Sequence, residues 1–203
     1  MPGVRAVCFD LGGVLIRIHP NWEGAAMTAG VESAATGALG GFPEFDRYQN
    51  GEVEDAAYFS SLADYLGVGV GEAETVHMSI LRDSFPGVSD LVGSLRDHGI
   101  ATGCLSNTNH SHWVEFHNEE RFPFWPMLNV KVGSHIVRAS KPEEVVFRTF
   151  EREVGASGGE VLYFDDSPKN VDAAVHLGWH GVLVDPATDP ARQIARALAS
   201  ESL

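Results

Sequence analysis

The chain has 203 residues, of which 44% are hydrophobic, and this suits one α/β domain with a sizeable insertion. Fourteen lysines and arginines stand against 28 aspartates and glutamates, giving a net charge of −14. This balance argues against nucleic acid or an acidic membrane surface as a partner. No apolar run approaches the ~18 residues that cross a bilayer.

Residues 1–8 lead directly into a strand pattern without a basic and apolar leader, so we expect no signal peptide and a cytoplasmic protein. The two cysteines, Cys8 and Cys104, lie inside apolar runs. We expect both thiols to be reduced and to pack against each other in the core.

The first predicted element is a buried strand at residues 4–10, which ends in a carboxylate. Gly12 and Gly13 follow it and indicate a tight loop whose backbone comes close to another group. Residues 21–85 then lack strand-like β-branched runs, and their apolar side chains recur at helical spacing. We predict a small helical cap of four or five helices at about residues 17–83.

Strands and helices alternate through the rest of the chain. The predicted strands are residues 100–106, 128–132, 160–166 and 180–184, and the predicted helices are residues 88–98, 141–154, a helix from 167, and 189–199. This alternation predicts an α/β fold, a Rossmann-like parallel sheet flanked by helices, with a core domain at residues 1–16 and 84–203. Ligands of such sheets bind at the carboxyl ends of the strands.

Polar side chains collect at those strand ends. In chain order they are Asp10, Ser106, Asn107, Lys141, Asp165 and Asp166. Carboxylates are ligands that Mg²⁺ accepts, and a lysine and a hydroxyl can hold phosphoryl oxygens. A carboxylate in line with phosphorus can attack it to form an aspartyl-phosphate. The group therefore predicts a site for a small phosphorylated metabolite.

Four short segments carry a family resemblance, in the family's order. They are FDLGGVL at residues 9–15, LSNT at 105–108, SKP at 140–142 and FDDSPKN at 164–170. The chain resembles the haloacid dehalogenase superfamily of hydrolases, in the subfamily IA branch, where a small helical C1 cap follows the first strand. Residues 45–66 resemble that cap.

The resemblance implies a role for each matching residue. Asp10 matches the catalytic nucleophile, Ser106 and Asn107 match the positions that bind the phosphoryl group, and Lys141 matches the lysine that neutralises its charge. These roles describe a hydrolase that works through an aspartyl-phosphate.

The resemblance also implies a Mg²⁺ site. Asp10, the backbone carbonyl of Gly12 and the carboxylate of Asp166 match its protein ligands. Asp165 stands where many relatives have glycine, so we expect it either to support the ligands from behind or to serve as an alternative ligand.

Gly12 departs from the family's phosphatase pattern, because many relatives have an aspartate there that protonates the leaving group. Such general acid–base help is worth about 10²–10⁴-fold. The enzyme could prefer good leaving groups such as anomeric sugar phosphates or acyl phosphates, another side chain such as His19 could supply the proton, or turnover could be lost. The same glycine occurs in a branch that includes sugar-phosphate phosphatases, which favours the first two interpretations.

The expected function is therefore Mg²⁺-dependent hydrolysis of a small phosphate monoester, with a sugar phosphate as one candidate. The alternatives are a phospholigand-binding pseudo-hydrolase and a haloacid dehalogenase. A dehalogenase needs no magnesium, so Asp166 weighs against it.

Three histidines, His110, His112 and His117, invite comparison with a zinc site. Their spacing lacks good third and fourth ligands, so we expect them to be solvated or to lie at the rim of the substrate site. The aromatic residues Phe122, Phe124 and Trp125 are expected to pack in the core.

Overall fold

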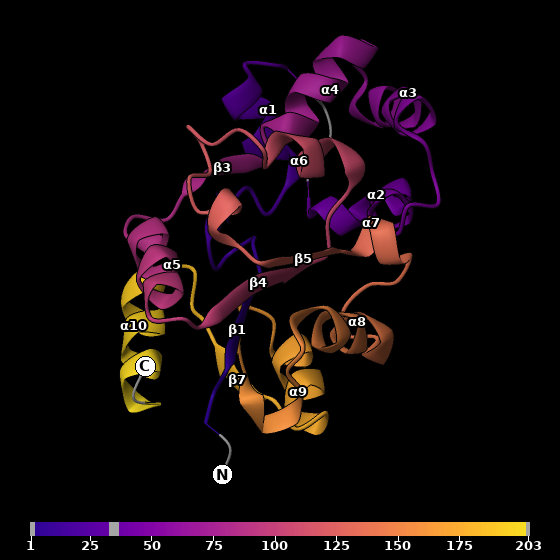
Figure 1. The fold of residues 1–203 in the computed structure, drawn as a ribbon. Coiled ribbons are helices and arrows are strands. Elements are labelled where there is room, and N and C mark those ends of the chain that lie inside the picture. Colours follow the sequence, from indigo (N-terminus) through magenta and orange to yellow (C-terminus); the bar gives the residue numbers. More distant parts are fainter. Residues whose placement is uncertain (1–2, 33–36, 202–203) are drawn as a thin grey trace.

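Five parallel strands form the central sheet of the computed structural model, in the order β5-β4-β1-β6-β7 (Figure 1). The strands are β1 (Ala6–Phe9), β4 (Ala101–Ser106), β5 (Val130–Gly133), β6 (Val161–Asp165) and β7 (His180–Leu183). All five predicted strands are present. The structure describes residues 3–32 and 37–201, so residues 1–2, 33–36 and 202–203 of the expected core and cap ranges lie outside the described residues.

Helices cover both faces of this sheet, as the strand and helix alternation predicts. α5 (Val88–Asp97) and α10 (Pro190–Ser200) pack on one face, and α8 (Glu144–Val154) and α9 (Pro168–His176) pack on the other. The short helices α6 (His110–Glu115) and α7 (Ser134–Val137) come after β4 and β5 in the chain. Single turns of 3₁₀-helix lie at Leu39–Gly41, Trp125–Met127 and Gly158–Glu160. Side chains alternate along β1. Val7 and Phe9 belong to the hydrophobic cluster of α5 and α10, whereas Ala6 and Cys8 belong to that of α8 and α9. The α/β architecture is confirmed.

The two cysteines are free and buried, but they do not share a face of the sheet. Cys104 pairs in register with Phe9 of the neighbouring strand and packs in the α5 and α10 cluster. Cys8 points to the opposite face. The expectation that the two thiols pack against each other is wrong, because the pairing register is offset by one residue and each one-residue step reverses the side-chain direction.

The described residues between 22 and 78 contain four α-helices that lie beyond the carboxyl ends of the core strands (Figure 1). They are α1 (Trp22–Ala29), α2 (Pro43–Gln49), α3 (Asp55–Leu66) and α4 (Val70–Met78). Trp22, Phe45 and Tyr58 belong to a hydrophobic cluster that is separate from the two clusters of the sheet. These helices therefore have a core of their own.

A two-stranded antiparallel ribbon joins these helices to the sheet. Its strands are β2 (Ile16–Ile18) and β3 (Leu81–Ser84). The prediction that the inserted block lacks strands is wrong at its two ends. Both strands are very short, and the β3 sequence LRDS has one buried residue, so neither carries a readable apolar alternation.

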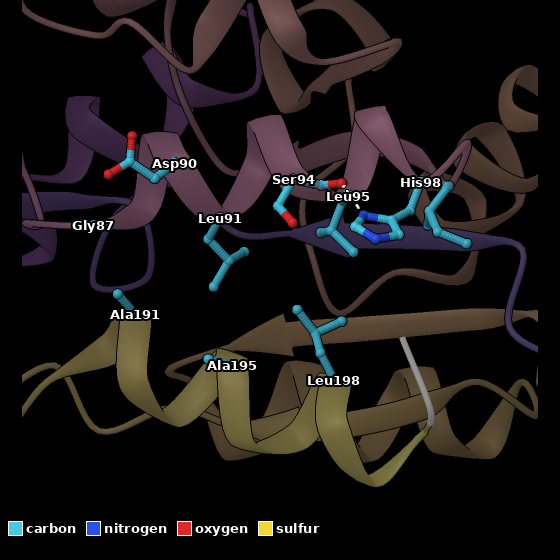
Figure 2. A pocket seen from close by; sticks show the side chains of 10 residues that line it. Gly87, Asp90, Leu91, Ser94, Leu95, His98, Ala191, Ala195 and Leu198 are labelled. Carbon is cyan, nitrogen blue, oxygen red and sulfur yellow. Dashed lines mark hydrogen bonds between the residues drawn. The ribbon is translucent and has the colours of Figure 1, made fainter.

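A groove of about 720 Å³ lies between α5 and α10, and its lining residues are drawn in Figure 2. Leu91 and Leu95 of α5 face Leu198 of α10 across it, and alanines of α10 form its floor. None of the predicted site residues lines this groove. Among the described residues, no helix has the length and apolarity needed to cross a membrane.

Candidate active site

The predicted site residues meet where three neighbouring strands end. Asp10 directly follows β1, Ser106 is the last residue of β4, and Asp165 is the last residue of β6. Because β1 lies between β4 and β6, Asp10 is at the centre of this edge. Lys141 reaches it from the segment between α7 and α8. Residues that are far apart in the chain thus form one group.

Lys141 is held between two carboxylates. Its Nζ lies 3.0 Å from Oδ1 of Asp10 and 2.7 Å from Oδ2 of Asp165, and its side chain is 2% exposed. Burial alone would lower the pKa of Lys141, but the two carboxylates outweigh it and raise that pKa. The ammonium group is therefore charged at neutral pH.

Asp165 is fully buried, and both of its oxygens are occupied. Oδ2 accepts from Lys141 Nζ and from the hydroxyl of Tyr163. Oδ1 accepts from the backbone N–H of Ser167 at 2.7 Å, and the amide of Asn170 donates to both oxygens at 3.1 Å. A carboxylate with this many donors is fixed in orientation.

Asp10 has fewer partners. Its Oδ1 accepts from the backbone N–H of Leu11 at 2.7 Å and faces Lys141. Oδ2 accepts no hydrogen bond from any residue that the structure describes. Burial raises the pKa of Asp10 to about 7 against the opposing effect of Lys141. One oxygen of this carboxylate is thus available to a reaction partner.

Three carboxylates gather at this point with one ammonium group. Ligand oxygens of Asp10, Asp165 and Asp166 lie within 4.8 Å of one another. Burial, and then the charge of Asp165, raise the pKa of Asp166. Such a surplus of buried negative charge fits a divalent cation, and carboxylates are oxygen ligands of the kind that Mg²⁺ prefers. The residues present therefore fit the metal that the sequence predicts.

The loop after Asp10 is drawn tightly against Asp166. Gly13 has a positive φ of 78°, and a Cβ added to it would collide with the carboxylate of Asp166. This is the close approach that the two glycines predict. At Gly12 a Cβ would lie 3.1 Å from Cδ1 of Ile18, the end of a flexible side chain.

Ser106 and Asn107 have different environments. Ser106 is a buried residue, and its hydroxyl has no hydrogen-bond partner in residues 3–32 and 37–201. The Asn107 amide instead holds the backbone of Lys141, accepting from its N–H at 2.8 Å and donating to its carbonyl at 3.1 Å. The Asn107 side chain thus positions Lys141.

The helices α1–α4, called the cap below, contact the carboxyl ends of the core strands through the end of α2. The Gln49 amide donates to the Asn107 carbonyl at 3.3 Å, and the Ser134 hydroxyl donates to the Gln49 carbonyl at 2.6 Å. The Ser140 hydroxyl donates to the side chain of Asn50. Asn107, Ser134 and Ser140 are thus hydrogen-bonded to Gln49 and Asn50 of the cap. Sequence reasoning missed this link.

His112 is buried and lines the cavity that Gly12 and Ser106 share, so of the two expectations for the histidines, a solvated ring is wrong for His112. Its Nε2 donates to the carbonyl of His77 at 3.0 Å, and its Nδ1 accepts from the Asn109 amide at 3.3 Å. Burial lowers its pKa to about 4. His110 is exposed, and its Nδ1 lies within hydrogen-bond distance, 2.8 Å, of Oδ2 of Asp55 in the cap. Neither arrangement resembles a zinc site.

His19, the candidate replacement acid, bonds to the Thr28 hydroxyl at 2.8 Å. It does not line the cavity that Gly12 and Ser106 share. Burial and Arg82 lower its pKa. No contact within the described part of the chain joins His19 to Asp10 or Ser106.

The sequence profile of the haloacid dehalogenase-like hydrolases matches residues 4–178. The chain belongs to this family. A HAD-like family hydrolase from Porphyromonas gingivalis has the same fold, with a TM-score of 0.79 and 24% identity over 96% of this chain and 98% of that one. A HAD family enzyme of Bacteroides thetaiotaomicron, solved with magnesium and inorganic phosphate, has a TM-score of 0.74 and 22% identity, covering 92% and 97% of the two chains.

Two curated relatives of this family member have similarly low sequence identity. The sesquiterpene phosphatase astK of Aspergillus oryzae is 20% identical, over 88% of each chain. The mouse protein acyl-CoA dehydrogenase family member 10 is 23% identical, over 89% of this chain. The chain spans only 18% of the length of that mouse protein.

Proposed function

We propose that this hydrolase is a Mg²⁺-dependent phosphatase of small phosphate monoesters, with Asp10 as its nucleophile. The observation that carries the proposal is the position of Asp10 at the centre of the strand ends, with Lys141 on one oxygen and the other oxygen free. Support also comes from the Bacteroides enzyme, which binds magnesium and phosphate, and from the Aspergillus phosphatase.

The residues of the candidate site would bind either the phosphoryl group or the metal. The free hydroxyl of Ser106, the backbone N–H of Asn107 and the ammonium of Lys141 would hold its oxygens. Asp10, the Gly12 carbonyl and Asp166 would hold Mg²⁺, since both oxygens of Asp165 are occupied. When bound, magnesium supplies positive charge that offsets the repulsion between the nucleophile and a phosphate dianion.

In the first chemical step a carboxylate oxygen of Asp10 attacks phosphorus, and the bond from phosphorus to the ester oxygen breaks. The electron pair of that bond leaves with the ester oxygen. Water then attacks the phosphorus of the aspartyl-phosphate, which releases inorganic phosphate and regenerates the carboxylate. Lys141 neutralises charge in both steps, and Asp165 and Asn107 keep it in place.

Metal dependence is the first test. We expect phosphate release from p-nitrophenyl phosphate to fall at least ~100-fold in excess chelator and to return when Mg²⁺ is restored. We expect Asp166→Asn to raise the Mg²⁺ concentration needed for half-maximal rate, because it removes one charged ligand. Asp172→Asn, an exposed acid on α9, is the matched control and should behave as wild type. Full activity in chelator would refute the metal role.

A further inference from the structure

A partly open cavity of about 130 Å³ lies between the cap and the strand ends. Gly12, Ser106 and Asn107 line one part of it, and Leu39 and Phe45 of the cap line another. A group bonded to a phosphoryl held at Ser106 therefore has this space to occupy. The cavity is continuous with the candidate active site, so its lining selects the organic part of the substrate.

The lining is more apolar than polar and carries no acidic side chain, lysine or arginine among the described residues. Eight of its fourteen residues are aliphatic or aromatic, and Ile18, Phe45 and Phe116 are among them. A charged group placed here would lose its hydration without gaining a partner.

Two of the polar lining groups are already engaged with the protein. The Gln49 amide nitrogen donates to the Asn107 carbonyl, and both ring nitrogens of His112 have protein partners. His112 is neutral, because burial lowers its pKa to about 4. Apart from the hydroxyls of Ser106 and Thr108 and the side-chain oxygen of Gln49, the polar side chains of the lining are engaged with the protein, so a sugar would leave some of its several hydroxyls without a hydrogen bond.

The size of the cavity limits the group further. An engineered protein cavity of about 150 Å³ binds benzene, so this space suits one ring or a short branched chain. Gly12 and neutral His112 provide no acid for a departing oxygen, which favours a group that leaves without a proton.

We propose, on the basis of the proposed function, that the preferred substrates are phosphate esters of compact, apolar, uncharged alcohols with an acidic hydroxyl, of which phenyl phosphate is the simplest example. The cavity formed by Ile18, Leu39, Phe45 and Phe116 binds the organic group. Sugar phosphates and esters that carry a second charge are poor substrates.

The test compares three non-hydrolysable phosphonates of similar length, with Mg²⁺ present. They are propylphosphonate, aminoethylphosphonate and phosphonopropionate. Binding is measured by calorimetry, so the ranking does not depend on turnover, and hydrolysis of p-nitrophenyl phosphate is measured beside it. We expect propylphosphonate to bind at least about tenfold more tightly than either charged analogue.

A charge-introducing variant provides a second readout. Ile18 is 38% exposed, so Ile18→Lys should fold while placing an ammonium at the cavity wall. We expect it to weaken propylphosphonate several-fold and to strengthen phosphonopropionate several-fold. Met27→Lys, on the cap surface and 76% exposed, adds the same charge elsewhere and should leave the ranking unchanged.

The outcomes separate the two proposals. Equal affinities for the three phosphonates, or tighter binding of an anomeric hexose phosphate than of phenylphosphonate, with hydrolysis intact, would overturn the apolar assignment alone. Absence of both hydrolysis and phosphonate binding would overturn the proposed function and, with it, this inference. Selective binding of propylphosphonate without hydrolysis would support the apolar cavity and refute turnover.

Discussion

Single residues at the strand ends differ in how many partners restrain them. Asp165 is surrounded by donors from β6, α9 and Lys141, and it therefore acts as a fixed counter-charge. Asp10 keeps one oxygen without a partner among the described residues. A nucleophile needs such a free lone pair, whereas a positioning residue does not. Two aspartates thus suit different roles because their neighbours differ.

Gly12 gives a prediction at this scale. If a missing acid limits the rate, Gly12→Asp should raise turnover of alkyl phosphates about tenfold or more, because it restores general acid–base help. Space exists for the change, since the added Cβ would meet only the end of the Ile18 side chain. Initial rates on an alkyl phosphate and an aryl phosphate measure the effect.

The control for this experiment is Gly12→Asn, which has nearly the same shape and cannot exchange a proton. An equal gain in both variants would contradict the acid–base explanation. So would the absence of any gain in a Gly12→Asp protein that circular dichroism shows to be folded.

Sequence reasoning predicted the candidate site from residues at strand ends, and the structure brings Asp10, Lys141 and Asp165 into contact, with Ser106 at the end of the neighbouring strand. It did not predict that the Asn107 amide holds the backbone of Lys141. That contact joins residues 34 positions apart, and no local pattern encodes which polar atoms meet across such a distance.

Elements of the cap and core meet at a pair of stacked histidines, His77 of α4 and His112 of α6, with ring centroids 4.2 Å apart. The Tyr58 hydroxyl donates to His77 Nδ1 at 3.0 Å, and His77 Nε2 donates to Asn109 at 3.3 Å. Burial lowers the pKa of both rings. Two neutral rings pack well here, and a charged pair would not.

This junction predicts a pH dependence of stability. The ordinary histidine pKa is about 6.5, and that of folded His112 is about 4, so the unfolded chain binds more protons between these values. The contribution of His112 is therefore complete above about pH 6.5 and is lost as the pH falls towards 4. Its loss is on the order of 3 kcal/mol in the free energy of unfolding.

Denaturant titrations at pH 7 and pH 5 measure this effect. The wild type should lose more stability on acidification than His112→Gln, whereas His176→Gln, at an exposed histidine, should follow the wild type. The comparison with wild type isolates His112 from Asp10, whose raised pKa acts in the opposite direction. Identical losses in wild type and His112→Gln would contradict the role of the junction.

The elements that sequence analysis found are those with a clear period. The core strands are apolar runs between helices with caps, so both length and pattern identify them. The β2 and β3 ribbon was missed because its strands have three and four residues and pair across the whole cap. Their pairing depends on how the cap folds, which periodicity does not report.

For the whole molecule, the fold places one sheet edge beneath a separately packed group of helices. The charge of −14 makes the average field unfavourable for a phosphate ester, so binding depends on local cations. Lys141 supplies one local cation. The three carboxylates gathered beside it fit a metal ion as a second cation. Sequence reasoning could predict this architecture, but the division into core and cap domains stays a prediction.

The central claim is that Asp10 carries the phosphoryl group during turnover. The most direct test is rapid acid quenching of the enzyme with an aryl phosphate and Mg²⁺, followed by mass spectrometry of its peptides. We predict one phosphoryl group on the peptide that contains Asp10, bound as an acyl phosphate to that residue, and none in Asp10→Asn. A phosphoryl group on another residue, or wild-type turnover by Asp10→Asn, would contradict the claim.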